Sequence, residues 1–94
     1  MSLLSDEAID RALEQLDWQR SGGELVKTVK RGNFAKAMAY VNEVANLAEA
    51  RDHHPDIDIR WDTVTLRLST HSEGGLTPLD IELATAIDAL AAGA

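Results

Sequence analysis

Residues 34–69 read FAKAMAYVNEVANLAEARDHHPDIDIRWDTVTLRLS, and within this stretch the spacing of the apolar residues changes from a helical to a strand pattern. Up to residue 50 the apolar side chains recur every three or four positions, in two neighbouring stripes: Phe34, Met38, Val41, Ala45 and Ala48, then Ala37, Tyr40, Val44 and Leu47. This broad apolar face predicts a buried central helix, ~25 Å long. Pro55 cannot continue a helix, so residues 51–54 should lie at its C-terminal end or just beyond it.

Two runs of alternating apolar and polar residues follow Pro55 and predict two strands. Their apolar residues are Ile57, Ile59 and Trp61, then Val64, Leu66 and Leu68. We expect a hairpin that turns near Trp61 and Asp62. An edge of the resulting sheet is a natural place for strand pairing between subunits, and we take residues 64–70 as the candidate strand.

The flanking sequence predicts two more helices and a second hairpin. Ser5 is a suitable N-cap for a first helix that ends near Leu16. Residues 18–20 and 24–30 flank Ser21-Gly22-Gly23, which suits a hairpin turn between two strands. Thr77 and Pro78 suit the N-cap and first position of a last helix. The apolar stripe expected on that helix is Leu79, Leu83, Ala86 and Leu90.

The predicted order of elements is therefore α-β-β-α-β-β-α. Strands joined by hairpins give an antiparallel sheet of four strands, and the apolar helix stripes need that sheet to pack against. We expect an α+β fold, a two-layer sandwich with the helices on one face of the sheet. With 94 residues, the chain should form a single domain spanning residues 1–94.

Composition excludes several classes of function. Nine Lys and Arg residues against 16 Asp and Glu give a net charge of −7, which is poorly suited to binding nucleic acid. The absence of cysteine excludes disulfides, thiolate catalysis and cysteine zinc sites. No apolar run approaches the ~20 residues of a membrane span, and the acidic N-terminus does not resemble a signal peptide. We expect a cytoplasmic protein without membrane contact.

The three histidines, His53, His54 and His71, fall within nineteen residues of one another, each near a predicted element boundary. Histidine changes charge near neutral pH, so it can both donate and accept a proton. Glu49 lies four residues before His53, one helical turn away. A carboxylate next to an imidazole fixes its tautomer, and these residues therefore suggest an acid/base pocket.

Each of these residues also has a structural explanation. The adjacent histidines could cap the last carbonyls of the central helix. Asp80 could reach back to the Thr77 amide as in a capping box, and the two tryptophans could be packing residues. Three histidines could also bind zinc, but neighbouring His53 and His54 point in different directions on most backbones, and we expect no metal.

The residues in combination resemble one family. The matching segments are Glu49-Ala-Arg-Asp52-His53-His54-Pro55, Trp61, Ser69-Thr70-His71, Gly75-Leu76-Thr77 and Asp80. They follow the pattern of the pterin-4a-carbinolamine dehydratases: E-x-x-x-H-H-P, an aromatic residue, a strand ending in T-H, then G-L-T-x-x-D. Trp18 also resembles a family position, and the similarity covers nearly the whole chain.

The resemblance implies a hydro-lyase that converts 4a-hydroxytetrahydrobiopterin to quinonoid dihydropterin and water, with no metal or other cofactor. It implies a homodimer or homotetramer and a functional link to an aromatic amino acid hydroxylase, in tetrahydrobiopterin recycling. The substrate could also be a pterin other than biopterin, or a molybdopterin-related compound. Because some family members act as dimerisation cofactors for a transcription factor, a partner-binding module with little catalysis is the alternative.

The resemblance also suggests a role for each matching residue. His53 and His71 would transfer protons, and His54 would bind the pterin. Glu49 would orient His53, and Asp80 would position His71 or its loop. Further substrate contacts would come from Asp52, Pro55, Ser69, Thr70 and Trp18.

Overall fold

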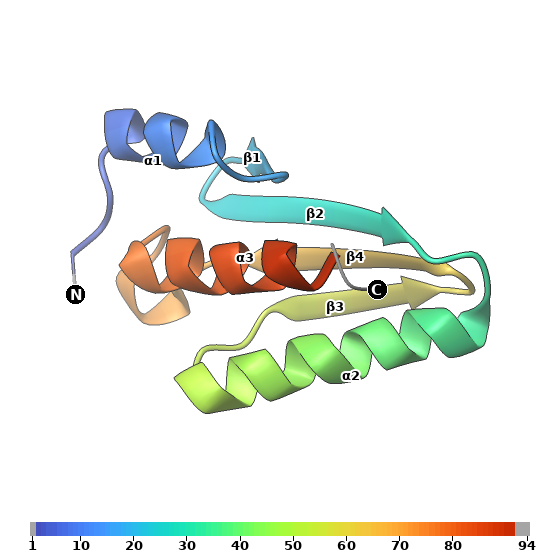
Figure 1. The fold of residues 1–94 in the computed structure, drawn as a ribbon. Coiled ribbons are helices and arrows are strands. Elements are labelled where there is room, and N and C mark those ends of the chain that lie inside the picture. Colours follow the sequence, from blue (N-terminus) through green and yellow to red (C-terminus); the bar gives the residue numbers. More distant parts are fainter. Residues whose placement is uncertain (1, 92–94) are drawn as a thin grey trace.

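The computed structural model describes residues 2–91, and it confirms the predicted two-layer α+β fold and order of elements (Figure 1). The helices are α1 (Asp6–Leu13), α2 (Phe34–Arg51) and α3 (Pro78–Ala91), with a short 3-10 helix η1 (His71–Glu73). The strands are β1 (Gln19–Ser21), β2 (Glu24–Lys30), β3 (Asp56–Arg60) and β4 (Thr63–Leu68). Within this part of the chain, none of the helices has the length and hydrophobicity required to cross a bilayer.

The four strands form one antiparallel sheet in the order β1-β2-β4-β3. Val64 of β4 pairs with Val29 on one side and Ile59 on the other. Because β4 has a partner on both sides, residues 64–70 are not an edge strand, and that prediction is wrong. The two edges of the sheet are β1 and β3.

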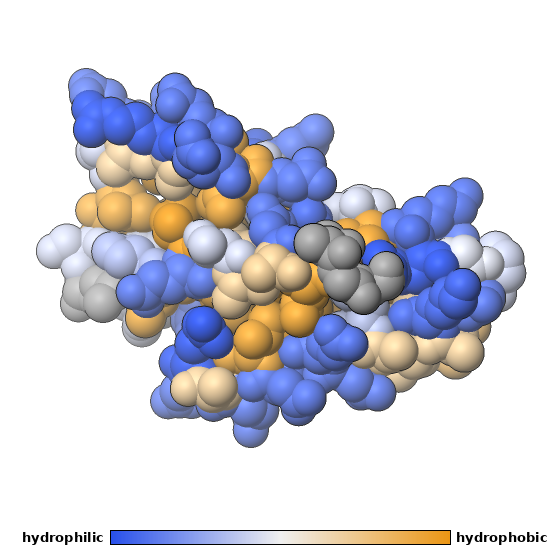
Figure 2. All heavy atoms as spheres, in the orientation of Figure 1, coloured by the Kyte–Doolittle hydropathy of each residue, from blue (hydrophilic) through white to orange (hydrophobic). Residues whose placement is uncertain are grey.

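The core lies between the sheet and the helices α2 and α3, which run across the same side of the sheet (Figure 1). Figure 2 shows apolar atoms gathered in the middle of this side, between a hydrophilic α1 and the hydrophilic outer surface of α2. The buried apolar residues of the two central strands are Leu25, Val64, Leu66 and Leu68, and those of the two long helices are Ala37, Tyr40, Val44, Ala48, Leu83, Ala84 and Ile87.

The buried faces of the helices differ in detail from the predicted stripes. Phe34 begins one predicted stripe of α2, but its side chain is 53% exposed. In α3, Ala84 and Ile87 are fully buried beside Leu83, because packing against both the sheet and α2 selects the buried face. The first helix ends at Leu13 and not near Leu16, since the amides of residues 14–16 bond to carbonyls three residues back in tight turns.

A polar cluster ties α3 to the sheet within this core. Lys27 lies on the core face of β2, only 5% exposed, and its Nζ lies 2.9 Å from a carboxylate oxygen of Asp88 on α3. The Trp18 indole N–H and the Asp17 amide also donate to Asp88, at 2.9 and 2.8 Å. A buried cation is tolerated when it is paired and hydrogen-bonded in this way.

Tyr40 is the chain's single tyrosine and is 3% exposed. Burial raises the pKa of Tyr40 from 10.0 to about 12. The negative charge of Asp88 adds to this rise, and the positive charge of Arg31 opposes it. The folded state therefore retains a proton that the unfolded state loses from about pH 10 upward. We expect the stability linked to this proton to be complete below that pH and to be lost as the pH rises towards 12.

The absorbance of tyrosinate reports this titration directly, because no other tyrosine is present. The free energy of unfolding, measured in urea, should fall more steeply through this alkaline range for the wild type than for Tyr40→Phe, which has no phenolic proton to lose. Tyrosinate that forms near pH 10 while the protein is still folded would contradict the prediction.

Candidate active site

The three histidines meet at one end of the molecule, although they come from two separate segments. His53 and His54 follow the C-terminal end of α2, and His71 begins η1 just after β4. A hollow of about 240 Å³ lies between these segments. Its lining consists of Asp52, His53, His54, Ser69, Thr70, His71 and Ser72. All but Ser72 were predicted from the sequence, and a serine at that position carries no recognisable signal.

The end of α2 determines where the two adjacent histidines point. Asp52 caps the helix in the left-handed conformation, at φ 48° and ψ 43°, which Asp adopts more readily than most residues. The His53 amide then donates to the Ala48 carbonyl at 3.1 Å. Because the chain leaves the helix at Asp52, His53 does not continue along the helical face that carries Glu49.

The pairing of carboxylates and histidines therefore differs from the prediction. Glu49 was expected to orient His53, but it accepts a hydrogen bond from the ring N–H of His54 at 2.5 Å. His53 donates from Nε2 to Asp80 instead, at 2.6 Å. The two pairs lie in different surroundings: the side chains of His54 and Glu49 are 52% and 76% exposed, whereas those of His53 and Asp80 are 10% and 0% exposed.

Asp80 connects the two halves of the site. One carboxylate oxygen accepts from His53, and the other accepts from the Thr70 hydroxyl at 2.8 Å and the Thr77 amide at 2.9 Å. The contact with the Thr77 amide is the predicted capping-box bond. Since a carboxylate oxygen accepts the bond, Nε2 of His53 is the donor, and in the neutral imidazole this leaves the lone pair on Nδ1.

The segment that carries His71 is held by Thr70. Its amide donates to the Gly75 carbonyl at 2.8 Å, and its carbonyl accepts from Glu73 and Gly74. Its hydroxyl proton goes to Asp80, so the Thr77 hydroxyl donates to Thr70 at 2.8 Å. Thr77 is fully buried, and this part of the network was not predicted. Only the capping-box spacing of Thr77 and Asp80 could have indicated it.

His71 itself is exposed, and its ring has no hydrogen-bonding partner within residues 2–91. The hollow therefore has a largely buried imidazole fixed by a carboxylate on one side and an exposed, unrestrained imidazole on the other. Two such groups can serve as a proton acceptor and a proton donor for one small molecule.

Trp18 lies outside this cluster. It is 6% exposed, bonds to Asp88 and lines a separate hollow with Asp17, Gln19, Val26, Lys27 and Thr28. Pro55 follows the histidine pair and does not line the histidine hollow. Across the described part of the chain, no three His, Asp or Glu side chains converge as a group that could hold a metal ion.

Comparison with known families and proteins covers almost the whole chain. The family described as Pterin 4 alpha carbinolamine dehydratase matches residues 2–90. A protein of Nocardia farcinica, provisionally named pterin-4-alpha-carbinolamine dehydratase, is 60% identical over 90 residues that cover 95% of each chain. A protein of Mycolicibacterium vanbaalenii with the same provisional name is 50% identical over 91 residues, which cover 96% of this chain and 98% of that protein.

Two solved structures resemble this fold. The crystal structure of a transcriptional coactivator/pterin dehydratase from Brucella melitensis has a TM-score of 0.91 and 33% identity, and it covers 96% of this chain and 99% of that one. A pterin dehydratase-like protein identified as a RuBisCO assembly factor in the alpha-carboxysome has a TM-score of 0.65 and 26% identity, with 81% and 88% of the two chains covered.

Proposed function

The chain belongs to the pterin 4 alpha carbinolamine dehydratase family, and we propose that it removes water from a 4a-hydroxytetrahydropterin to give a quinonoid dihydropterin. The observation that carries this proposal is the hollow in which His53, His54 and His71 meet. Family membership alone would not establish catalysis, because function depends on the site and not on the fold. The proposed enzyme would act in the cytoplasm as a homo-oligomer and recycle a tetrahydropterin after an aromatic amino acid hydroxylase has used it.

The reaction needs one acid and one base. The C4a–O bond breaks, and the departing hydroxyl takes a proton from the acid and leaves as water. The N5 lone pair forms the new C4a=N5 double bond, and the base removes the N5 proton. Two imidazoles can supply both proton transfers near neutral pH, and no net proton is consumed.

The hydrogen bonds of the site favour His53 as the base. Asp80 holds the Nε2–H of His53, which leaves Nδ1 free to accept the N5 proton. The buried carboxylate then stabilises the imidazolium that forms. His71 acts as the acid from the other side of the hollow, and its solvent contact allows it to recover a proton from water.

The remaining residues bind the ring. His54, held by Glu49, contacts the pterin at the exposed rim of the site. Because the backbone groups of Thr70 are already bonded within the loop, the polar edge of the pterin pairs with side chains of Asp52, Ser69 and Ser72. The volume of about 240 Å³ falls below the ~300 Å³ of most ligand pockets, so the hollow receives the flat ring and leaves its substituent in solvent.

A partner-binding role is the second candidate. It is favoured by the names of the two structural neighbours, a transcriptional coactivator/pterin dehydratase and a RuBisCO assembly factor. A purely structural role would not require a buried carboxylate bonded to a histidine in an open hollow. The presence of the His53–Asp80 pair therefore favours catalysis as the main function.

An assay with carbinolamine generated in situ tests the proposal. An aromatic amino acid hydroxylase supplies the 4a-hydroxytetrahydropterin, and its dehydration is followed spectroscopically with and without the purified protein. We expect a rate above the uncatalysed reaction that rises in proportion to the protein concentration. A rate equal to the uncatalysed one at every concentration would overturn the proposal and leave partner binding as the function.

A further inference from the structure

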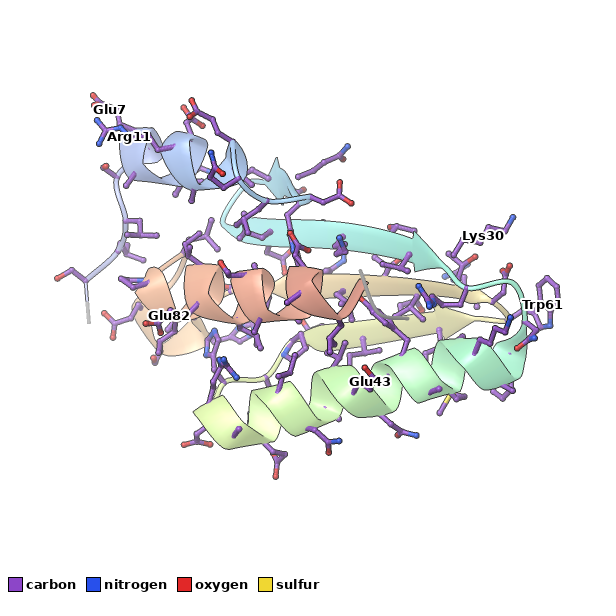
Figure 3. All side chains as sticks on the ribbon, in the orientation of Figure 1. Glu7, Arg11, Lys30, Glu43, Trp61 and Glu82 are labelled. Atoms are coloured by element: carbon purple, nitrogen blue, oxygen red, sulfur yellow. The ribbon has the colours of Figure 1, made fainter. Side chains whose placement is uncertain are left out.

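A second hollow, of about 420 Å³, lies at the other end of α2 from the histidines. Its residues come from the end of β2, the connection that follows and the first turns of α2: Lys30, Arg31, Lys36, Ala39, Tyr40 and Glu43. Figure 3 shows Lys30 and Glu43 on the two elements that border it. None of these residues lines the histidine hollow.

The cations of this hollow differ from the other cations of the chain. Five of the nine Lys and Arg residues lie within 4.0 Å of a carboxylate oxygen: Arg11, Arg20, Lys27, Arg60 and Arg67. Arg51 donates to the Leu47 carbonyl. Within residues 2–91, the three that have neither kind of partner all line this hollow, and they are Lys30, Arg31 and Lys36. In a chain with a net charge of −7, this concentrates unpaired positive charge at one place.

The hollow also has buried donors without acceptors. The Tyr40 hydroxyl and the Arg31 Nε are both buried, and neither has a hydrogen-bonding partner among the described residues. The guanidinium carbon of Arg31 lies over the Tyr40 ring, 5.4 Å from its centroid. Asp88, whose charge acts on Tyr40, already accepts from Asp17, Trp18 and Lys27. Buried polar groups are rarely left unpaired, so the pair of donors points to an acceptor supplied by a ligand.

We propose that this basic hollow binds the phosphate group of a small organic phosphate monoester. A phosphate presents several acceptor oxygens, which match the planar fork of Arg31, the two lysine ammonium groups and the tyrosine hydroxyl. The hollow is large enough to hold an organic group as well, and the exposed Ala39 provides apolar surface for it. Glu43 at the border disfavours a ligand with negative charge along its whole length.

This assignment is tested by titrating a phosphate ligand into the protein at constant ionic strength and monitoring the backbone amide resonances of the protein. The probes are inorganic phosphate and phenyl phosphate. We expect saturable shifts centred on residues 30–43, with tighter binding of phenyl phosphate. Shifts centred on the histidine hollow, no saturation, or phenyl phosphate binding no tighter than inorganic phosphate would overturn the proposal. The carbinolamine assay is not involved, so the two proposals fail independently.

Matched variants locate the site. Arg31→Gln should weaken phenyl phosphate binding about tenfold to hundredfold, since it removes charge-assisted hydrogen bonds. Arg11→Gln removes the same charge from α1, at the opposite end of the molecule from Lys30 (Figure 3), and should leave binding unchanged. Lys36→Gln, at an exposed position, should also weaken binding and serves if Arg31→Gln does not fold. Equal weakening by Arg11→Gln and the hollow variants would show general charge attraction and overturn the proposal.

Discussion

Replacing His53 by alanine is expected to slow dehydration of the carbinolamine by about 100- to 10,000-fold, because the site then loses the group that accepts the N5 proton. The loss should fall on kcat, since proton transfer stabilises the transition state and contributes little to binding of the ground state. The measurement is the in situ assay at saturating substrate, with KM determined in parallel.

A second substitution separates proton transfer from positioning. His53→Gln keeps an N–H that can donate to Asp80, but an amide cannot accept a proton near neutral pH. We expect His53→Gln to dehydrate the carbinolamine nearly as slowly as His53→Ala. Its free energy of unfolding in urea should stay closer to that of the wild type. If His53→Gln retained the wild-type rate, His53 would be a positioning residue and the proposed mechanism would be wrong.

Replacing Asp80 by alanine is expected to lower the free energy of unfolding by about 3–5 kcal/mol, the usual cost of breaking a buried charged network. Asp80 is 0% exposed, and its removal leaves the His53 ring, the Thr70 hydroxyl and the Thr77 amide without their acceptor. Against a total stability of about 5–15 kcal/mol for a domain, this loss is large. Urea unfolding with an unchanged m-value measures it.

Two variants control this comparison. Asp80→Asn retains one oxygen that can accept from Thr70 or Thr77, so it should be less destabilising than Asp80→Ala. Asp58→Ala removes a carboxylate that forms an exposed ion pair with Arg60, and it should change stability by less than about 0.5 kcal/mol. A loss below about 1 kcal/mol for Asp80→Ala would show that the buried network contributes little.

The fold could be predicted from the sequence because its periodicities are strong. The change of spacing after Pro55 separates α2 from the β3–β4 hairpin, and both were found where the pattern placed them. The order of the strands in the sheet was harder to predict from the sequence. The alternation in residues 64–68 indicates a strand with one buried face, but it does not distinguish an edge strand from a central one.

Most residues that line the histidine hollow could be predicted from the sequence, but their contacts could not. Its histidines and carboxylates stand in a recognisable order along the chain. Their pairing depends on the left-handed cap at Asp52, which moves His53 towards Asp80 and leaves Glu49 to His54. Helical spacing describes neighbours only while the helix continues. Backbone angles at a single cap residue therefore decided a contact that spacing alone assigned wrongly.

The basic hollow could not be predicted from the sequence at all. Lys30, Arg31 and Lys36 are ordinary surface residues in a linear reading, and Tyr40 reads as a core residue of α2. Their significance comes from which cations have no partner among residues 2–91 of the folded chain. Ion pairs such as that of Lys27 with Asp88 join residues far apart in the sequence, so which cations remain without a partner is known only after folding.

The most direct test of the central claim is the dehydration rate of the variant in which both His53 and His71 are replaced by alanine. The claim is that the end of α2 and the segment after β4 place two imidazoles around one pterin ring. The account predicts that this double variant, folded as judged by urea unfolding, dehydrates carbinolamine no faster than the reaction without protein. A folded double variant that matched the wild-type rate would contradict it.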